Sequence, residues 1–172
     1  MKQLFSILLL FSLSIFATAC GDEHDHDDHD HEAHGDETIQ DEACEHMASG
    51  PATAVTAGAT EAEATDTSVD DWEHKRVDIS LNDNGDGSFS GYVTYEAAEA
   101  AEYVFFTSGE LTLQINGTDA ESTAAVDECS DVLNGLTFDL EVGESILFIT
   151  ATTETVSMVA EEAGEHEDHS DG

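Results

Sequence analysis

Basic residues are nearly absent from this sequence, which has three Lys and Arg against 40 Asp and Glu and a formal net charge of −37 at pH 7. A surface of this sign repels the phosphates of nucleic acids and the headgroups of anionic lipids, so neither is expected as a partner. It attracts metal cations or a cationic protein instead. The alternative is that the acidic groups only keep the protein soluble in a salty medium.

Signatures of catalysis are also missing. The sequence has no serine-centred nucleophile elbow, and His74 is the only His between His46 and His166. Asn82–Gly87 has the composition of a calcium-binding loop, but neither register puts a Glu at the twelfth position that closes such a loop. We therefore expect a protein that is not an enzyme, with a plain turn at Asn82–Gly87.

The N-terminal region holds one long apolar run, Leu4–Phe16, which follows a basic residue and is too short to span a bilayer comfortably. This pattern predicts a signal peptide over residues 1–19. The motif Ala17-Thr18-Ala19-Cys20 resembles a bacterial lipobox, and the resemblance implies a lipidated Cys20 that anchors the exported chain in the cell envelope. Gly21 after the cysteine, in place of Asp, favours the outer membrane. The alternative is ordinary cleavage that leaves Cys20 as a free thiol.

The tract that follows, residues 20–37, consists mainly of Asp, Glu and His. Such a segment cannot bury enough apolar surface to offset the entropy of ordering, so on its own we expect it to be unfolded. Imidazoles bind zinc, copper or nickel, and neighbouring carboxylates add oxygen ligands. Binding should involve several sites and leave the stability of the folded body nearly unchanged. The candidate ligands are His24, His26, His29, His31 and His34, with His166 and His169 in the similar tail at residues 163–172.

A short helix is predicted over residues 38–49. Thr38 has the character of an N-cap, with Asp41 three residues later as its capping-box partner. Apolar residues recur at i, i+4 and i+8, and a Gly-Pro pair ends the pattern. The helix should therefore dock on the rest of the fold through this stripe, which consists of Ile39, Ala43 and Met47.

Two cysteines, Cys44 and Cys129, lie beyond the N-terminal region. An even pair in an exported protein predicts a disulfide, and Cys44 borders the apolar stripe of the predicted helix. The alternative is a metal-binding corner made by Cys44 and His46, close to the His-rich tract.

Residues 50–162 have the pattern of a small antiparallel β-sandwich of jelly-roll or immunoglobulin-like type. Apolar residues alternate with polar ones, and Gly-bearing turns separate the runs. Residues 58–71 indicate a loop or linker, and Ser122–Leu133 is ambiguous between a strand with a loop and a helical turn. The expected strands are Ala52–Ala57, Arg76–Leu81, Ser88–Tyr95, Ala101–Ser108, Leu111–Asn116, Leu136–Glu141, Ser145–Thr150 and Thr155–Glu161.

Two family resemblances follow from these patterns. Ala98–Phe106, Leu111–Ile115 and Phe138–Ile149 resemble strands of the small β-sandwich domains appended to secreted bacterial exoproteins such as proteases. The layout as a whole resembles bacterial lipoproteins with an acidic, His-rich leader. Both resemblances imply an exported β-sandwich, and neither implies an activity.

Taken together, the patterns predict an envelope lipoprotein that binds or buffers divalent transition metal ions through its His-rich tract, with an envelope protein as a further partner. The alternative is a non-enzymatic surface interaction or adhesion module whose acidic ends only provide solubility.

Overall fold

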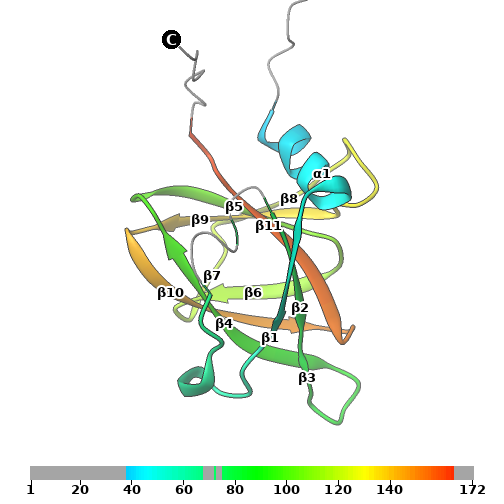
Figure 1. Cartoon of the computed structure of the whole chain (residues 1–172), viewed down its shortest axis with the longest axis vertical. Coiled ribbons are helices and arrows are strands. Elements are labelled where there is room, and N and C mark those ends of the chain that lie inside the picture. Colours follow the sequence, from blue (N-terminus) through cyan, green and yellow to red (C-terminus); the bar gives the residue numbers. More distant parts are fainter. Residues whose placement is uncertain (1–37, 68–71, 73–74, 165–172) are drawn as a thin grey trace, which may run out of the picture. The chain divides into compact units, whose positions relative to one another are not determined.

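The computed structural model describes residues 38–67, 72 and 75–164 of the chain. In these residues two β-sheets pack face to face, and helix α1 (Ile39–Ser49) covers part of the outer face of one sheet (Figure 1). The all-β sandwich with one preceding helix that the sequence predicts is therefore confirmed. Among the described residues, no helix is long and apolar enough to cross a membrane.

The first sheet has six strands in the order β1-β2-β11-β5-β9-β8. Neighbouring strands run antiparallel, as predicted, except that β1 and β2 pair in parallel at one edge. The bounds are β1 Ala52–Thr56, β2 Arg76–Ser80, β11 Thr155–Glu162, β5 Ala101–Thr107, β9 Asn134–Leu140 and β8 Ser122–Ala125. The segment that was ambiguous in the sequence, Ser122–Leu133, is thus a strand followed by a loop.

The parallel pair follows from the connection after β1. Gly58 and Tyr92 exchange backbone hydrogen bonds of 2.8 and 3.0 Å, so the chain crosses to the second sheet. It makes a short 3-10 turn at Glu61–Glu63, pairs again at Thr65, and later returns beside β1 in the same direction. The described part of residues 58–71 is therefore a loop held against the sandwich.

The second sheet has five strands in the order β3-β4-β10-β6-β7, all antiparallel to their neighbours. The turn expected at Asn82–Gly87 lies between its first two strands, except that Asn82 and Asp83 belong to β3. Asp83 Oδ1 accepts a hydrogen bond from the Gly85 N–H at 2.7 Å, and Asp86 Oδ1 accepts one from the Ser88 N–H at 3.0 Å. The bounds are β3 Asn82–Asp83, β4 Phe89–Ala97, β10 Gly143–Ala151, β6 Leu111–Ile115 and β7 Thr118–Asp119.

The space between the sheets is filled by aromatic and branched side chains. Trp72 meets Tyr95 and Phe105 edge to face, with ring centroids 5.5 and 6.2 Å apart, and its indole N–H donates to Thr67 Oγ1 at 3.0 Å. Trp72 precedes β2, whereas the core side chains of the strands come from alternate positions, as the period-two pattern predicts.

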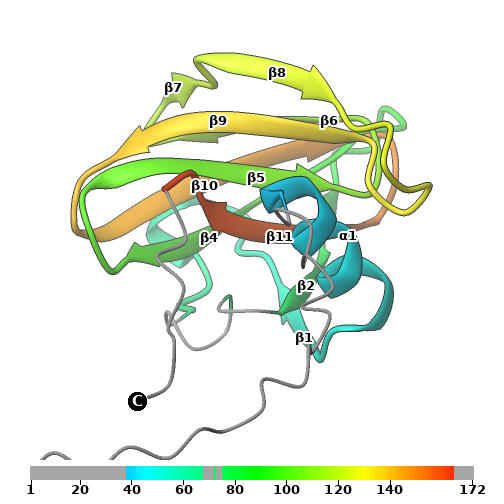
Figure 2. The same ribbon diagram turned by 90° about the horizontal axis from the view of Figure 1, so that it is seen from above.

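Helix α1 lies against the six-stranded sheet on the side away from the second sheet (Figure 2). A second apolar cluster lies between α1 and this sheet. Because this face is covered, β5 is buried on both of its faces, and its apolar residues run consecutively from Tyr103 to Phe106. The buried members of this outer cluster are Ala43, Met47, Val104, Phe106, Val126, Val132 and Val159.

Helix α1 begins and docks as its sequence predicts. The Thr38 hydroxyl accepts a hydrogen bond from the Asp41 N–H at 3.2 Å, and the Asp41 carboxylate accepts one from the Thr38 N–H at 3.1 Å, which completes a capping box. These hydrogen bonds lower the pKa of Asp41. Ala43 and Met47 are buried and Ile39 packs beside them.

Candidate metal centre

Glu42 and His46 lie on α1 next to the residues that dock it. Positions four apart on a helix share one face, so Glu42 and His46 flank the buried pair Ala43 and Met47 at the edge of the contact with the sheet. Both are partly buried. The helix therefore presents a carboxylate and an imidazole together, beside the outer face of the six-stranded sheet.

The third member of the group, Glu161, comes from β11. Val156, Met158 and Ala160 point into the sandwich, so the alternation of the strand turns Val159 and Glu161 toward α1. Glu161 is only 6 % exposed, and a carboxylate this buried needs a polar partner. His46 provides one, with its Nδ1 2.8 Å from Glu161 Oε1.

Glu42, His46 and Glu161 together have the geometry of a ligand set. One candidate ligand atom from each residue lies within 4.8 Å of the other two. Two atoms that bind one ion at about 2.0–2.2 Å lie at most about 4.4 Å apart, so these side chains are candidate ligands that would close slightly around an ion. The carboxylate of Glu161 also affects a side chain inside the sandwich. Burial is the main cause that raises the pKa of Tyr95, and the charges of Tyr103, Glu161 and Glu162 raise it further.

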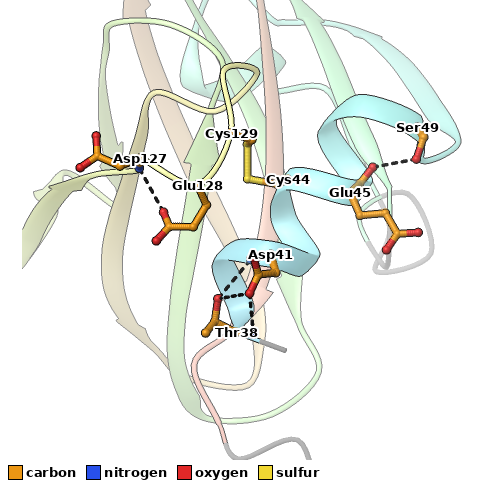
Figure 3. The surroundings of a disulfide bond; sticks show 8 residues. All are labelled: Thr38, Asp41, Cys44, Glu45, Ser49, Asp127, Glu128 and Cys129. Atoms are coloured by element: carbon orange, nitrogen blue, oxygen red, sulfur yellow. Dashed lines mark hydrogen bonds between the residues drawn. A yellow bond between two sulfur atoms is a disulfide. The ribbon is translucent and has the colours of Figure 1, made fainter. Parts of the chain in front are cut away.

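A disulfide holds α1 in place between its two candidate ligands. Cys44 on α1 is joined to Cys129 in the loop after β8, as expected from the sequence, with the Cα atoms 6.0 Å apart (Figure 3). Both cysteines pack against the outer cluster. A disulfide of this kind indicates an extracytoplasmic domain.

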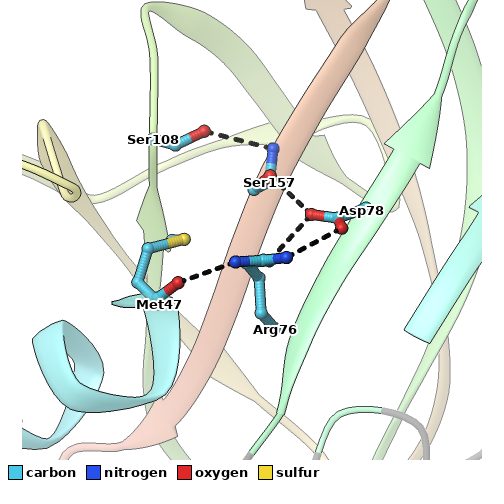
Figure 4. Close-up of polar contacts among 5 residues, drawn as sticks. All are labelled: Met47, Arg76, Asp78, Ser108 and Ser157. Atoms are coloured by element: carbon cyan, nitrogen blue, oxygen red, sulfur yellow. Dashed lines mark hydrogen bonds and ion pairs between the residues drawn. The ribbon is translucent and has the colours of Figure 1, made fainter. Parts of the chain in front are cut away.

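Arg76 of β2 ties the end of α1 to the sheet (Figure 4). Its Nη1 donates to the Met47 carbonyl oxygen at 3.0 Å, and its Nε lies 3.0 Å from Asp78 Oδ1 in an ion pair. The same Oδ1 accepts a hydrogen bond of 2.6 Å from the Ser157 hydroxyl on β11. The helix and the strand that carry the candidate ligands are therefore linked through β2.

The donor atoms define which ions suit this group. One imidazole and two carboxylates favour borderline and hard divalent ions, such as zinc, cobalt, nickel or manganese. The nearby sulfurs of Cys44 and Cys129 are used in the disulfide and cannot act as thiolates. The arrangement thus disfavours ions that select soft sulfur ligands, such as Cu(I).

Sequence reasoning located only part of this group. The sequence offers His46 as a ligand together with Cys44 as the alternative to a disulfide, whereas the structure places Cys44 in the disulfide and brings Glu42 and Glu161 to His46. The Glu-x-x-x-His spacing on a predicted helix was a usable signal for Glu42. The remaining predicted sites lie outside the described residues: Cys20, His24, His26, His29, His31, His34, His166 and His169.

Comparison with known proteins does not assign the chain to a family. It matches no protein-family model and no curated protein sequence.

Proposed function

We propose that this protein binds divalent transition metal ions outside the cytoplasm, and that Glu42, His46 and Glu161 form a fixed site for one ion. The observation that carries the proposal is the convergence of three ligand atoms within 4.8 Å of one another, from two elements that a disulfide and Arg76 hold in place. A preformed set of this kind lowers the entropy lost when an ion binds.

An ion pair between His46 and Glu161 is the simplest alternative reading of the same contact. It accounts for the 2.8 Å approach of these two side chains. It does not require the second carboxylate, Glu42, to lie at ligand distance from both of them. Two carboxylates also balance the charge of a divalent cation, which is the pairing that a metal site needs.

The His-rich tract increases the number of metal ions that the protein can bind. Its five His, from His24 to His34, offer exchangeable ligands for several ions, and a lipid on Cys20 would keep the chain at the envelope. The proposed role is therefore binding or buffering of metal at the envelope, without catalysis.

Substitution of the leader His distinguishes metal binding at Glu42, His46 and Glu161 from metal binding in the His-rich tract. In the mature chain the five leader His are changed to Asn, which gives a parent that we call the leader variant. Calorimetric titration with Zn²⁺ should find one site in this parent. Glu42→Gln should weaken that site by at least about tenfold, because it removes one ligand while His46 and Glu161 keep their contact.

The matched control is Glu45→Gln, which removes the same charge from an exposed position of the same helix. It should leave Zn²⁺ affinity within about twofold of the parent, because a single exposed charge adds little at physiological salt. Equal Zn²⁺ binding by Glu42→Gln and Glu45→Gln would mean that the carboxylates act only as an ion atmosphere, and the fixed site would be abandoned.

A further inference from the structure

We propose that the outer face of the five-stranded sheet binds a neutral carbohydrate in a hollow built around Tyr92 and Phe148. This function goes beyond metal binding, because Glu42, His46 and Glu161 lie on α1 and the other sheet. The described residues include one α-helix, and it packs on that other sheet. The hollow has a volume of about 300 Å³, which is at the lower end of the range for small-molecule sites.

Tyr92 and Phe148 form a stacked pair across β4 and β10. They are direct partners in the register of the two strands, with ring centroids 4.6 Å apart and an angle of 29° between the rings. Their neighbours Val93 and Leu147 belong to the core, so the alternation of each strand turns both rings to the outer face. Every other aromatic side chain of the described residues lies in or against one of the two apolar clusters. Core packing therefore does not account for this pair.

Polar groups lie on both sides of the two rings. Gln114 of β6 is the register partner of Phe148 on its other side, and its Nε2 donates to Asp119 Oδ1 at 2.9 Å. A side-chain amide has two hydrogens and two lone pairs, so Gln114 can still donate and accept hydrogen bonds. Glu61 lines the hollow from the 3-10 turn, which backbone pairing holds beside β4. The hollow thus combines an apolar ring surface with both donors and acceptors.

These groups suit a neutral sugar better than a cation or an anion. The C–H groups on one face of a sugar ring pack on an aromatic ring, and the hydroxyls both donate and accept hydrogen bonds. An ammonium or guanidinium group only donates, so it would leave the Gln114 amide hydrogen without an acceptor. An anionic sugar is repelled by Glu61, by Asp119 and by the formal charge of −37 on the whole chain. The ligand class that remains is a neutral saccharide.

The experiment titrates the mature chain with neutral hexasaccharides, namely cellohexaose, laminarihexaose, maltohexaose and chitohexaose, in a calorimeter. At least one should bind, and hexagalacturonate should bind at least about tenfold more weakly because its carboxylates are repelled. Phe148→Leu keeps the apolar bulk but removes the ring, so it should weaken binding by at least about fivefold. Gln114→Ala should weaken binding by at least about threefold. The matched control is Thr112→Ala, at an exposed position on the same face of β6, and it should stay within about twofold of the parent.

Binding of none of the four neutral hexasaccharides would overturn the proposal. Equal binding by Phe148→Leu, Gln114→Ala and Thr112→Ala would also overturn it, since the ring pair would then only stabilise the sheet. Binding of choline that is lost in Phe148→Leu, without binding of any hexasaccharide, would make the hollow a site for organic cations instead. Circular dichroism checks the fold of each variant, and Gln114→Ala decides the outcome if Phe148→Leu does not fold.

Discussion

Arg76 shows how much of the helix docking depends on one side chain. It is one of three Lys and Arg residues in the sequence, and it lies where α1, β2 and β11 meet. Its guanidinium contacts the Met47 carbonyl oxygen and Asp78, which in turn accepts from Ser157. A planar, multi-donor group satisfies a helix-end carbonyl and a carboxylate at the same time, which Lys cannot do with the same geometry.

The first prediction concerns this residue. Arg76→Gln should lower the free energy of unfolding by about 1–3 kcal/mol, because it removes a charge-assisted hydrogen bond to Met47 and leaves the half-buried Asp78 without its ion-pair partner. Urea unfolding measures the change. A double-mutant cycle with Asp78→Asn separates the ion pair from the helix contact, and full additivity of the two changes would show that Arg76 and Asp78 are not coupled.

At the scale of elements, α1 acts as the cover of the six-stranded sheet. It buries the outer faces of β5 and β11 and carries two of the three candidate ligands. An isolated helix of 11 residues is marginal in water, so its position depends on docking, the disulfide and Arg76. Whatever loosens α1 should therefore weaken metal binding before it disturbs the sandwich.

The disulfide gives a direct test of that order. Replacement of both cysteines by Ser opens a covalent loop of 85 residues and should lower the free energy of unfolding by about 4 kcal/mol in the chain-entropy description. Zn²⁺ affinity should fall as well, because α1 must then be ordered when the ion binds. Far-UV circular dichroism and Zn²⁺ titration, both well below the unfolding temperature, check the two effects. Unchanged Zn²⁺ affinity would show that packing alone fixes the helix.

The sequence predicts where the helix and the strands lie better than it predicts which of them come into contact. Thr38, Asp41 and the four-residue stripe identify α1, and alternation identifies the long strands, because both signals depend only on neighbours in the chain. The parallel pairing of β1 depends on the crossing of residues 58–67, which has no such local pattern. The candidate site has the same limitation, since Glu161 meets His46 across 115 residues of sequence.

For the whole molecule, the main consequence of the proposed site is that metal binding and folding would be linked. The sequence alone predicts ions bound in the His-rich tract, with nearly unchanged stability of the folded body. A site that bridges α1 and β11 predicts the opposite, since an ion that binds only the native arrangement stabilises it. Excess Zn²⁺ at 100 times the dissociation constant should add about 2.7 kcal/mol.

Thermal unfolding with and without Zn²⁺ distinguishes these two predictions. The unmodified mature chain and the leader variant should be stabilised to a similar extent, because both retain Glu42, His46 and Glu161. Glu42→Gln should lose most of the stabilisation, and Glu45→Gln should retain it. Stabilisation that disappears in the leader variant but persists in Glu42→Gln would place the relevant ions in the His-rich tract.

The division of the candidate ligands between a helix and a strand also determines how fast an ion could leave. Separation of α1 from β11 would pull the proposed ligands apart while the two sheets stay closed, and such a local opening costs less free energy than global unfolding. The residence time of the ion should therefore follow the hydrogen-exchange rate of the α1 amides. The bond between Cys44 and Cys129 limits that opening, so reduction of this bond should shorten the residence time of an ion at the proposed site.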